Sequence, residues 1–264
     1  MSIGKKLEFC RSEREGGLLF VTIDRPERMN ALHWRANEEL SGIFDAFEAD
    51  PELWVAILTG AGDRAFCAGN DLKYQATEAK GELRAGPASG FAGLTSRFGL
   101  TKPVIAAVNG VAMGGGFEIA LACDMIVAAS DARWGFPEVR RGVVASSGAL
   151  FRAPRSLPLH VAKELLLSGA ETTTGRLEHL GVVNRMVEPG GALAAALELA
   201  REICVSSPTA VQQTLRAVDR IVGESDDFGW AATADSVRTN FASDDSAEGV
   251  AAFLEKRQPN WTGR

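Results

Sequence analysis

Short hydrophobic runs recur along the first half of the chain, and they predict a set of buried strands. The runs occupy residues 7–9, Leu18–Ile23, 54–59, Val104–Val108 and Met125–Ala129, with a shorter one at 132–136. We interpret the polar stretch between the first two runs, residues 11–17, as a turn. Apolar residues at helical spacing, from Leu40 to Phe47, predict a helix that ends near Asp50. Strand, turn, strand and helix therefore follow one another repeatedly, although without a fixed period.

Beyond about residue 155 the pattern becomes helical. The predicted helices, the first of which lies just before this boundary, occupy residues 146–152, 158–167, 193–203, 208–222, 228–241 and 245–257. Ser207 and Pro208 mark the start of the fourth of these, as N-cap and first helical residue. Two stretches, 60–73 and 75–99, show neither pattern and are interpreted as loops. We expect a catalytic core at 1–200 and a C-terminal helical region at 201–264 that is not an independent domain.

The most informative stretch is the turn Gly114-Gly115-Gly116 and the residues after it. The turn follows the strand Val104–Val108, and residues 117–122 are apolar except for Glu118. Glycines leave backbone N–H groups open to a ligand, and a helix that begins there directs free N–H groups and a positive dipole end at the same place. A carboxylate beside a turn that attracts anions indicates proton transfer next to a developing negative charge.

Composition and charge narrow the class of function. The chain has 264 residues, of which 46% are hydrophobic and 23% charged, and its net charge is -6. This balance disfavours a broad surface for nucleic acid or anionic membranes. No apolar run is long enough to span a membrane, and residues 1–6 lack the apolar core of a signal peptide. The four cysteines and three histidines are scattered, so we expect free thiols in the cytoplasm and no bound metal.

Several common motifs are absent or incomplete. Residues 60–65 match a loose dinucleotide fingerprint, but no amphipathic helix follows, and we reject it. The glycine turn has no Walker lysine, and the chain has no G-x-S-x-G elbow. Two glutamates remain, Glu118 and Glu138. A solvated acid is the default interpretation of each, but Glu118 lies among apolar residues, and a buried, unpaired carboxyl group can act as an acid or base.

Four motifs in order resemble one known family. They are Arg25-Pro26 with Asn30-Ala31-Leu32, then residues 65–73 (AFCAGNDLK), then residues 102–124 around the glycine turn, then Phe136-Pro137-Glu138. Together they resemble the crotonase (enoyl-CoA hydratase/isomerase) superfamily from about residue 18 to the C-terminus. Within that superfamily, residues 90–95, 114–122 and 248–264 resemble carnitinyl-CoA dehydratase.

The resemblance implies an α/β fold, a crotonase-like ββα superhelix with a C-terminal helical trimerisation region. It implies a homotrimer or a hexamer built as a dimer of trimers. It implies that the backbone N–H groups of Asn70 and Gly115 form an oxyanion hole for a thioester carbonyl. The residues it assigns to contact with CoA are Ala68, Asp71, Leu72, Lys73 and, across a subunit boundary, Lys256. It implies no cofactor, because the CoA thioester is itself the substrate.

The function that the resemblance implies is reversible hydration of an α,β-unsaturated acyl-CoA, with Glu118 and Glu138 as the acid/base pair. Carnitinyl-CoA dehydratase, a hydratase-lyase for aromatic acyl-CoAs and a non-catalytic CoA-thioester-binding or RNA-associated relative remain as alternatives. Ser146 stands where isomerases of the family, and carnitinyl-CoA dehydratase, place an acid. This departure disfavours isomerisation and weakens the carnitinyl assignment.

Overall fold

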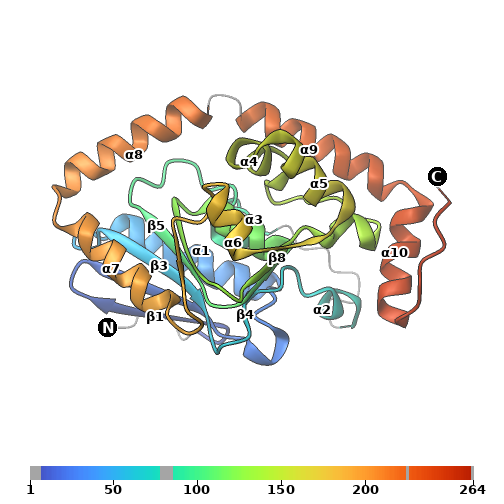
Figure 1. The fold of residues 1–264 in the computed structure, drawn as a ribbon, viewed down its shortest axis with the longest axis horizontal. Helices are drawn as coiled ribbons and strands as arrows, with labels where there is room; N and C mark the ends of the chain where they lie inside the picture. Colours follow the sequence, from blue (N-terminus) through green and yellow to red (C-terminus); the bar gives the residue numbers. More distant parts are fainter. Residues whose placement is uncertain (1–6, 78–85, 224–225, 263–264) are drawn as a thin grey trace.

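The larger of two sheets lies between helices that cover both of its faces. The computed structural model describes residues 7–77, 86–223 and 226–262. The large sheet has six strands in the order β1-β2-β3-β5-β7-β10 (Figure 1). Its strands are β1 (Cys10–Glu15), β2 (Leu18–Ile23), β3 (Val55–Gly60), β5 (Val104–Val108), β7 (Met125–Ala129) and β10 (Arg185–Val187). Only β1 is antiparallel to its neighbour.

A smaller sheet of four strands has the order β4-β6-β8-β9. Its strands are β4 (Ala65–Cys67), β6 (Val111–Met113), β8 (Arg133–Gly135) and β9 (Glu171–Thr173). Each of β4, β6 and β8 comes a few residues after a strand of the large sheet, namely β3, β5 and β7. The chain therefore steps from the large sheet to the small one three times, and the turns that follow the small strands gather at one place.

Helices cover both faces of the large sheet and extend beyond it. They are α1 (Trp34–Ala49), α2 (Leu72–Thr77), α3 (Gly115–Ala122), α4 (Ala149–Ser156), α5 (Leu159–Ser168), α6 (Thr174–His179), α7 (Ala192–Cys204), α8 (Pro208–Gly223), α9 (Asp226–Phe241) and α10 (Asp244–Glu255), with the 3-10 turns η1 (Pro26–Arg28), η2 (Phe91–Gly93) and η3 (Pro137–Arg141). Alternate residues of β3 point to opposite faces, as the pleat requires. Leu58 lies in the core that includes α1, and Ile57 lies in the core that includes α7.

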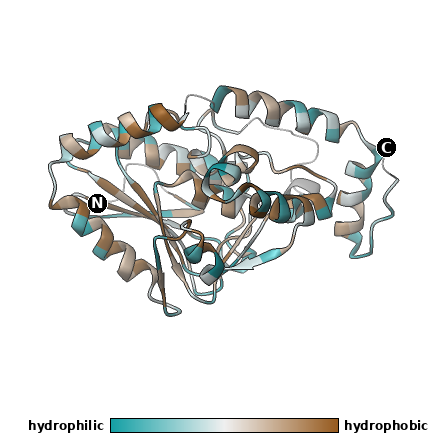
Figure 2. Ribbon diagram, turned by 45° about the horizontal axis from the view of Figure 1, so that its top comes forward, coloured by the Kyte–Doolittle hydropathy of each residue, from teal (hydrophilic) through white to brown (hydrophobic). Residues whose placement is uncertain are grey.

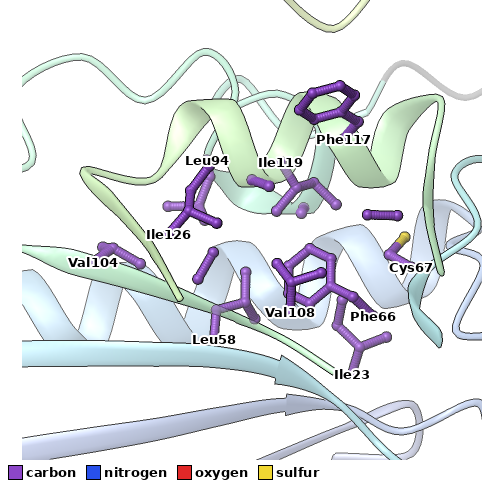
Figure 3. Packing of buried hydrophobic residues seen from close by; sticks show 14 of the residues in the cluster. Ile23, Leu58, Phe66, Cys67, Leu94, Val104, Val108, Phe117, Ile119 and Ile126 are labelled. Carbon is purple, nitrogen blue, oxygen red and sulfur yellow. The ribbon is translucent and has the colours of Figure 1, made fainter. Parts of the chain in front are cut away.

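Helix α3 is buried on most of its surface because it packs against strands of both sheets, β4, β6 and β7, and against α4 and η2. In Figure 3, Ile119 points from α3 toward Val108 and Phe66, while Phe117 lies on the opposite side of the helix. The Phe117 ring stacks on the Phe136 ring, with centroids 4.5 Å apart. Aromatic contacts of this kind add to the stabilisation from burial and fix the helix in one orientation. The residues at the start of α3 are therefore held rigidly.

The last three helices leave the core. Figure 1 shows α8 and α9 passing over the core and α10 turning down beside it. No residue of α8 is buried, although the helix carries hydrophobic as well as hydrophilic residues along its length (Figure 2). Among the described residues, no helix is both long and apolar enough to cross a membrane.

Most predicted elements are confirmed within one to three residues, and the α/β class is confirmed. The strand predicted at 7–9 and the turn predicted at 11–17 are both wrong, because the strand is Cys10–Glu15, at the sheet edge, where polar side chains face water. The stretch 60–73 also contains β4 and the start of α2. The part beyond residue 155 is not wholly helical, since β9 and β10 lie there; each has only three residues, too few to show a period. Part of the predicted loop 75–99 lies outside the described residues.

Candidate active site

Three segments meet at one end of α3: residues 68–71, the turn Gly114–Gly116, and η3. The first two are in backbone contact. A methyl group added at Gly69 would lie 2.9 Å from the carbonyl oxygen of Met113 and 3.1 Å from the nitrogen of Gly115. Side chains do not tolerate contacts of this length with backbone atoms, so only glycine allows the two segments to approach.

The segment that carries Asn70 is tied to the motif at residues 25–32. The Leu32 N–H donates to the Gly69 carbonyl at 2.8 Å, and the Asp71 N–H donates to the Leu32 carbonyl at 2.9 Å. The Arg25 guanidinium forms a buried ion pair with Asp71, 2.9 Å between nitrogen and oxygen. These bonds bracket Asn70, an exposed residue whose own N–H donates to no acceptor within the described residues.

Each glycine of the central turn faces a different neighbour. A methyl group at Gly114 would lie 2.9 Å from Glu138 Oε1, and one at Gly115 would lie 2.5 Å from Cε1 of Phe91. A methyl group at Gly116 would overlap the carbonyl group of Cys67 in β4. Close packing on three sides therefore accounts for three consecutive glycines in this turn.

The start of α3 offers a free backbone donor. Gly115 is the first residue of α3, and in the described part of the chain its N–H donates to no acceptor. Free N–H groups at a helix N-terminus carry partial positive charge and favour anions. With the Asn70 N–H, whose neighbour Gly69 touches this turn, the site has two backbone donors beside each other, an arrangement that can stabilise an oxyanion.

Glu118 is buried and fixed by backbone donors. Its side-chain oxygen Oε1 accepts N–H groups from Ser147 at 2.7 Å and from Ala149 at 3.0 Å, at the start of α4. Burial raises the pKa of the Glu118 carboxyl group, while these two N–H groups and the positive charge of Arg152 act in the opposite direction. Sequence reasoning did not find these donors, although a helix predicted at 146–152 was a signal, because its N-terminus attracts anions.

Glu138 lies in η3, opposite the glycine turn, and has a different environment. Its Oε2 atom is buried and has no hydrogen-bond partner. Burial and, second, the negative charge of Glu118 raise the pKa of the Glu138 carboxyl group to about 8. The two glutamates are thus brought together, as expected from the sequence. An arginine lies near each, Arg152 for Glu118 and Arg141 for Glu138, but only Glu118 accepts N–H groups from other residues, and only Glu138 has a pKa raised by the charge of the other glutamate. The negative charge of the pair therefore belongs on Glu118 and the proton on Glu138.

The residues assigned to CoA fall into two groups. Ala68, Leu72 and Lys73 surround Asn70, and of these Lys73 is exposed on α2. Asp71 is buried, and its carboxylate is bonded to Arg25 and to the Tyr74 N–H. The Asp71 side chain therefore holds the segment in place and does not face a ligand. Lys256 is exposed at the C-terminal end of α10, and nothing in the described structure links it to residues 68–73.

One wall of the site was not predicted. Phe91 lies against Gly115, and the residue after it, Ala92, has a φ of 54°, which is unfavourable for a residue other than glycine. The Ala92 N–H is held by Asn37 Oδ1 at 2.7 Å, and the Phe91 N–H by Thr95 Oγ1 at 2.8 Å. Backbone strain that the surroundings hold in place is common at functional sites. Only the unusual run Gly90-Phe91-Ala92-Gly93 in the sequence hinted at this turn.

Among the described residues, no group of three or more His, Cys, Asp or Glu side chains could hold a metal ion. The site is defined instead by two carboxyl groups and two backbone donors. It can bind an oxyanion, accept a proton at one carboxylate and donate a proton from the other.

Comparison with known proteins gives a consistent picture. Residues 13–264 match the family model described as enoyl-CoA hydratase/isomerase. A carnitinyl-CoA dehydratase of Salmonella arizonae is 42% identical over 260 residues, which cover 97% of this chain and 99% of the relative. The crystal structure of a carnitinyl-CoA hydratase from Mycobacterium avium has a TM-score of 0.92 at 39% identity, covering 98% of this chain and 100% of that one. An enoyl-CoA hydratase from Mycobacterium tuberculosis is 42% identical with a TM-score of 0.77, covering 97% of this chain and 99% of that one.

Proposed function

The chain belongs to the enoyl-CoA hydratase/isomerase family, as its motifs indicated, and on that premise we propose how its residues carry out the hydratase reaction. The fold is the crotonase fold, and the protein is a lyase of this family. The proposed reaction is reversible addition of water across the 2,3 double bond of an acyl-CoA thioester. Glu118 and Glu138 are the proposed acid/base pair, and the Asn70 and Gly115 N–H groups the proposed oxyanion hole.

The observation that carries the proposal is the unequal environment of the two glutamates. Glu118 accepts two backbone N–H groups, whereas Glu138 has a buried oxygen without a partner and a pKa raised to about 8. One carboxylate and one carboxylic acid therefore face the same site near neutral pH. Hydration of a conjugated thioester needs one group to accept a proton from water and another to donate a proton to carbon.

The proposed step runs as follows. Glu118 removes a proton from water while the water oxygen bonds to the β carbon. The electrons of the double bond move to the thioester oxygen, and the resulting enolate is held by the Asn70 and Gly115 N–H groups. Glu138 then donates its proton to the α carbon as the carbonyl re-forms. The proton taken up by Glu118 returns to Glu138, directly or through solvent. In a comparable site, each oxyanion donor contributes about 3–4 kcal/mol.

The experiment that tests these roles follows the loss of conjugated-thioester absorbance with crotonyl-CoA. We expect Glu118→Gln and Glu138→Gln each to lower kcat by about 10²–10⁴-fold, the usual contribution of general acid/base catalysis. Glu52→Gln, at an exposed glutamate before β3, is the control and should leave kcat unchanged. If both site variants retained wild-type turnover, the proposed mechanism would be wrong.

A second candidate is dehydration of carnitinyl-CoA. It is favoured by the names of relatives about 41–42% identical over most of the chain. It would use the same two glutamates and the same donors with a different acyl pocket. Comparing kcat/KM for crotonyl-CoA and carnitinyl-CoA decides between them, and a higher value for carnitinyl-CoA, lost in Glu118→Gln, would replace the first candidate. An aromatic acyl-CoA such as a cinnamoyl thioester completes the series.

We also propose that the protein assembles as a trimer, or as a dimer of trimers, through its C-terminal helices. Helix α8 has no buried residue, and Ile221 and Val222 at its end are 76% and 55% exposed. A cavity of about 730 Å³ separates α8 from the core below it. An exposed apolar helix face of this kind is normally covered by a partner. Ile221→Asp should therefore shift the mass measured by light scattering toward the monomer.

The remaining proposals concern location and cofactors. Cys10 and Cys67 are free and buried, as expected in a reducing compartment, and we propose the cytoplasm. The two glutamates and two backbone donors are sufficient for the proposed proton transfers, so we expect no cofactor beyond the thioester substrate.

A further inference from the structure

Helix α10 packs directly against η3, the turn that carries Glu138. In Figure 1, α10 lies at the edge of the molecule, beside the core and not over it. The contact is made by Gly249 of α10 and the backbone of Arg141 and Gly142. A methyl group at Gly249 would lie 2.5 Å from the carbonyl carbon of Arg141 and 2.7 Å from the nitrogen of Gly142. Because these are main-chain atoms, they cannot move aside without moving the turn.

The backbone that Gly249 touches is bonded to Glu138. The Gly142 N–H caps η3 by donating to the carbonyl oxygens of Glu138 and Val139. The Val143 N–H also donates to the Glu138 carbonyl, at 3.1 Å. Gly142 has a φ of +69°, and a methyl group there would lie 3.3 Å from the Cα atom of Gly249. A displacement of α10 therefore reaches the Glu138 main chain through one residue.

The position of the Glu138 side chain depends on the backbone of η3, because hydrogen bonds from other residues fix Glu118 but not Glu138. Within the described residues, no hydrogen bond from another residue holds its carboxyl group, and its Oε2 atom has no partner. Its Oε1 atom instead packs against Gly114, the N-cap of α3. Glu118, in contrast, is fixed by two N–H donors. The position of Glu138 is thus set by packing and by η3.

Helix α10 also holds a charge beside Glu138. The Arg141 guanidinium carbon lies 4.8 Å from the centroid of the Phe253 ring on α10, a cation–π contact. The positive charge of Arg141 acts to lower the pKa of Glu138, against the larger effect of burial. The same helix face therefore touches both the turn and the arginine that accompanies the glutamate.

We propose that α10 positions Glu138 for proton transfer, with Gly249 as the positioning residue that brings the helix onto η3. This role is separate from subunit assembly, and it rests on the proposed function of Glu138 as the proton donor. A displacement of about 1 Å at a reacting group can lower the rate by about 100-fold. Binding of the thioester, which uses other segments, should change much less.

The test is Gly249→Ala, assayed with crotonyl-CoA. Alanine is a better helix former than glycine, so the substitution does not weaken α10 itself. We expect kcat to fall by about 10- to 100-fold with KM changed by less than about twofold. Gly42→Ala in α1 is the matched control, because a methyl group there meets nothing within 4 Å, and its kcat should equal the wild-type value.

A double variant shows whether the effect passes through Glu138. In the Glu138→Gln background, Gly249→Ala should lower the residual kcat by less than about twofold, because the group being positioned is gone. An equal fold loss in both backgrounds, or an unchanged kcat in Gly249→Ala, would overturn the positioning role. Phe253→Ala is the second variant for the case in which Gly249→Ala does not fold, because it removes atoms and inserts none. It should lower kcat by about threefold to tenfold without changing KM. An unchanged kcat in this variant would again overturn the positioning role. Full activity in Glu138→Gln alone would instead contradict the proposed function.

Discussion

Replacing Glu138 by glutamine should make the protein more stable at high pH. Glutamine has nearly the shape of the protonated carboxyl group but cannot ionise. The pKa of Glu138 is raised from 4.5 to about 8 in the folded protein, chiefly by burial and then by the charge of Glu118. The folded state therefore holds the proton more tightly than the unfolded state. The stability that this contributes is complete below about pH 4.5 and is lost as the pH rises through about 8.

The size of the effect follows from the shift. Each pKa unit corresponds to about 1.4 kcal/mol, so the wild type loses about 3 kcal/mol of unfolding free energy by pH 7 and about 5 kcal/mol by pH 9, which the glutamine variant does not lose. The Glu118 charge is part of the cause. In a Glu118→Gln background the pKa of Glu138 should fall, and the gap between glutamate and glutamine at position 138 should become smaller.

Urea unfolding at pH 5, 7 and 9 measures the difference in unfolding free energy between the variant and the wild type. All titrations use one protein concentration, so that the degree of assembly is the same. The control, Glu52→Gln, lies on the surface and should show no trend with pH. The reasoning would be refuted if the difference in unfolding free energy between Glu138→Gln and the wild type were constant from pH 5 to 9, or became smaller as the pH rises. The same proton should set the activity profile, so kcat/KM of the wild type should fall as the pH rises through about 8.

Three further predictions test other parts of the site. Arg25→Met leaves Asp71 as a buried charge without its partner, and should lower the unfolding free energy by about 3–5 kcal/mol in urea titrations; a loss below about 1 kcal/mol would contradict the structural role of the pair. Arg152→Gln removes a positive charge that favours ionised Glu118, so the pKa of Glu118 should rise and the acidic limb of the kcat/KM profile should move to higher pH; an unmoved limb would argue against it. Dialysis against EDTA should leave turnover of crotonyl-CoA unchanged, and a loss restored by a divalent cation would contradict the absence of a metal requirement.

The sequence was sufficient to predict the elements with strong patterns. The run Val104–Val108 and the apolar stripe of α1 are fixed by local hydrophobic periodicity. The strand has the predicted bounds and α1 ends within one residue of its predicted end, although its start at Trp34 was not predicted. The glycine turn and Glu118 were also evident, because three consecutive glycines before an apolar helix have few uses. Most strands of three residues were missed, since three residues cannot show a period of two; β6, between Gly110 and Gly114, is an example, whereas β8 was predicted from the run at 132–136.

Contacts between distant segments were beyond a single sequence. The ion pair between Arg25 and Asp71 joins residues 46 positions apart, and both look like ordinary surface charges in the sequence. The family resemblance assigned Asp71 to contact with CoA, whereas its carboxylate is buried and bonded to Arg25. For the same reason the donors to Glu118, which come from residues 29 and 31 positions later, could be found only in the folded chain.

The glycines show most clearly what the fold adds to the sequence. A glycine turn before a helix predicts an anion site from local geometry alone, and that prediction needs only the N–H of Gly115. The structure shows that Gly114 has a second task, because its missing side chain leaves room for the Glu138 carboxyl group. In the proposed mechanism, one turn thus provides a donor for the oxyanion and space for the acid that protonates the neighbouring carbon. Gly114 lies next to the proposed oxyanion donor, but a side chain at position 114 would meet the Glu138 carboxyl group first. A loss of activity in a Gly114 variant therefore reports on Glu138 as well as on the oxyanion hole.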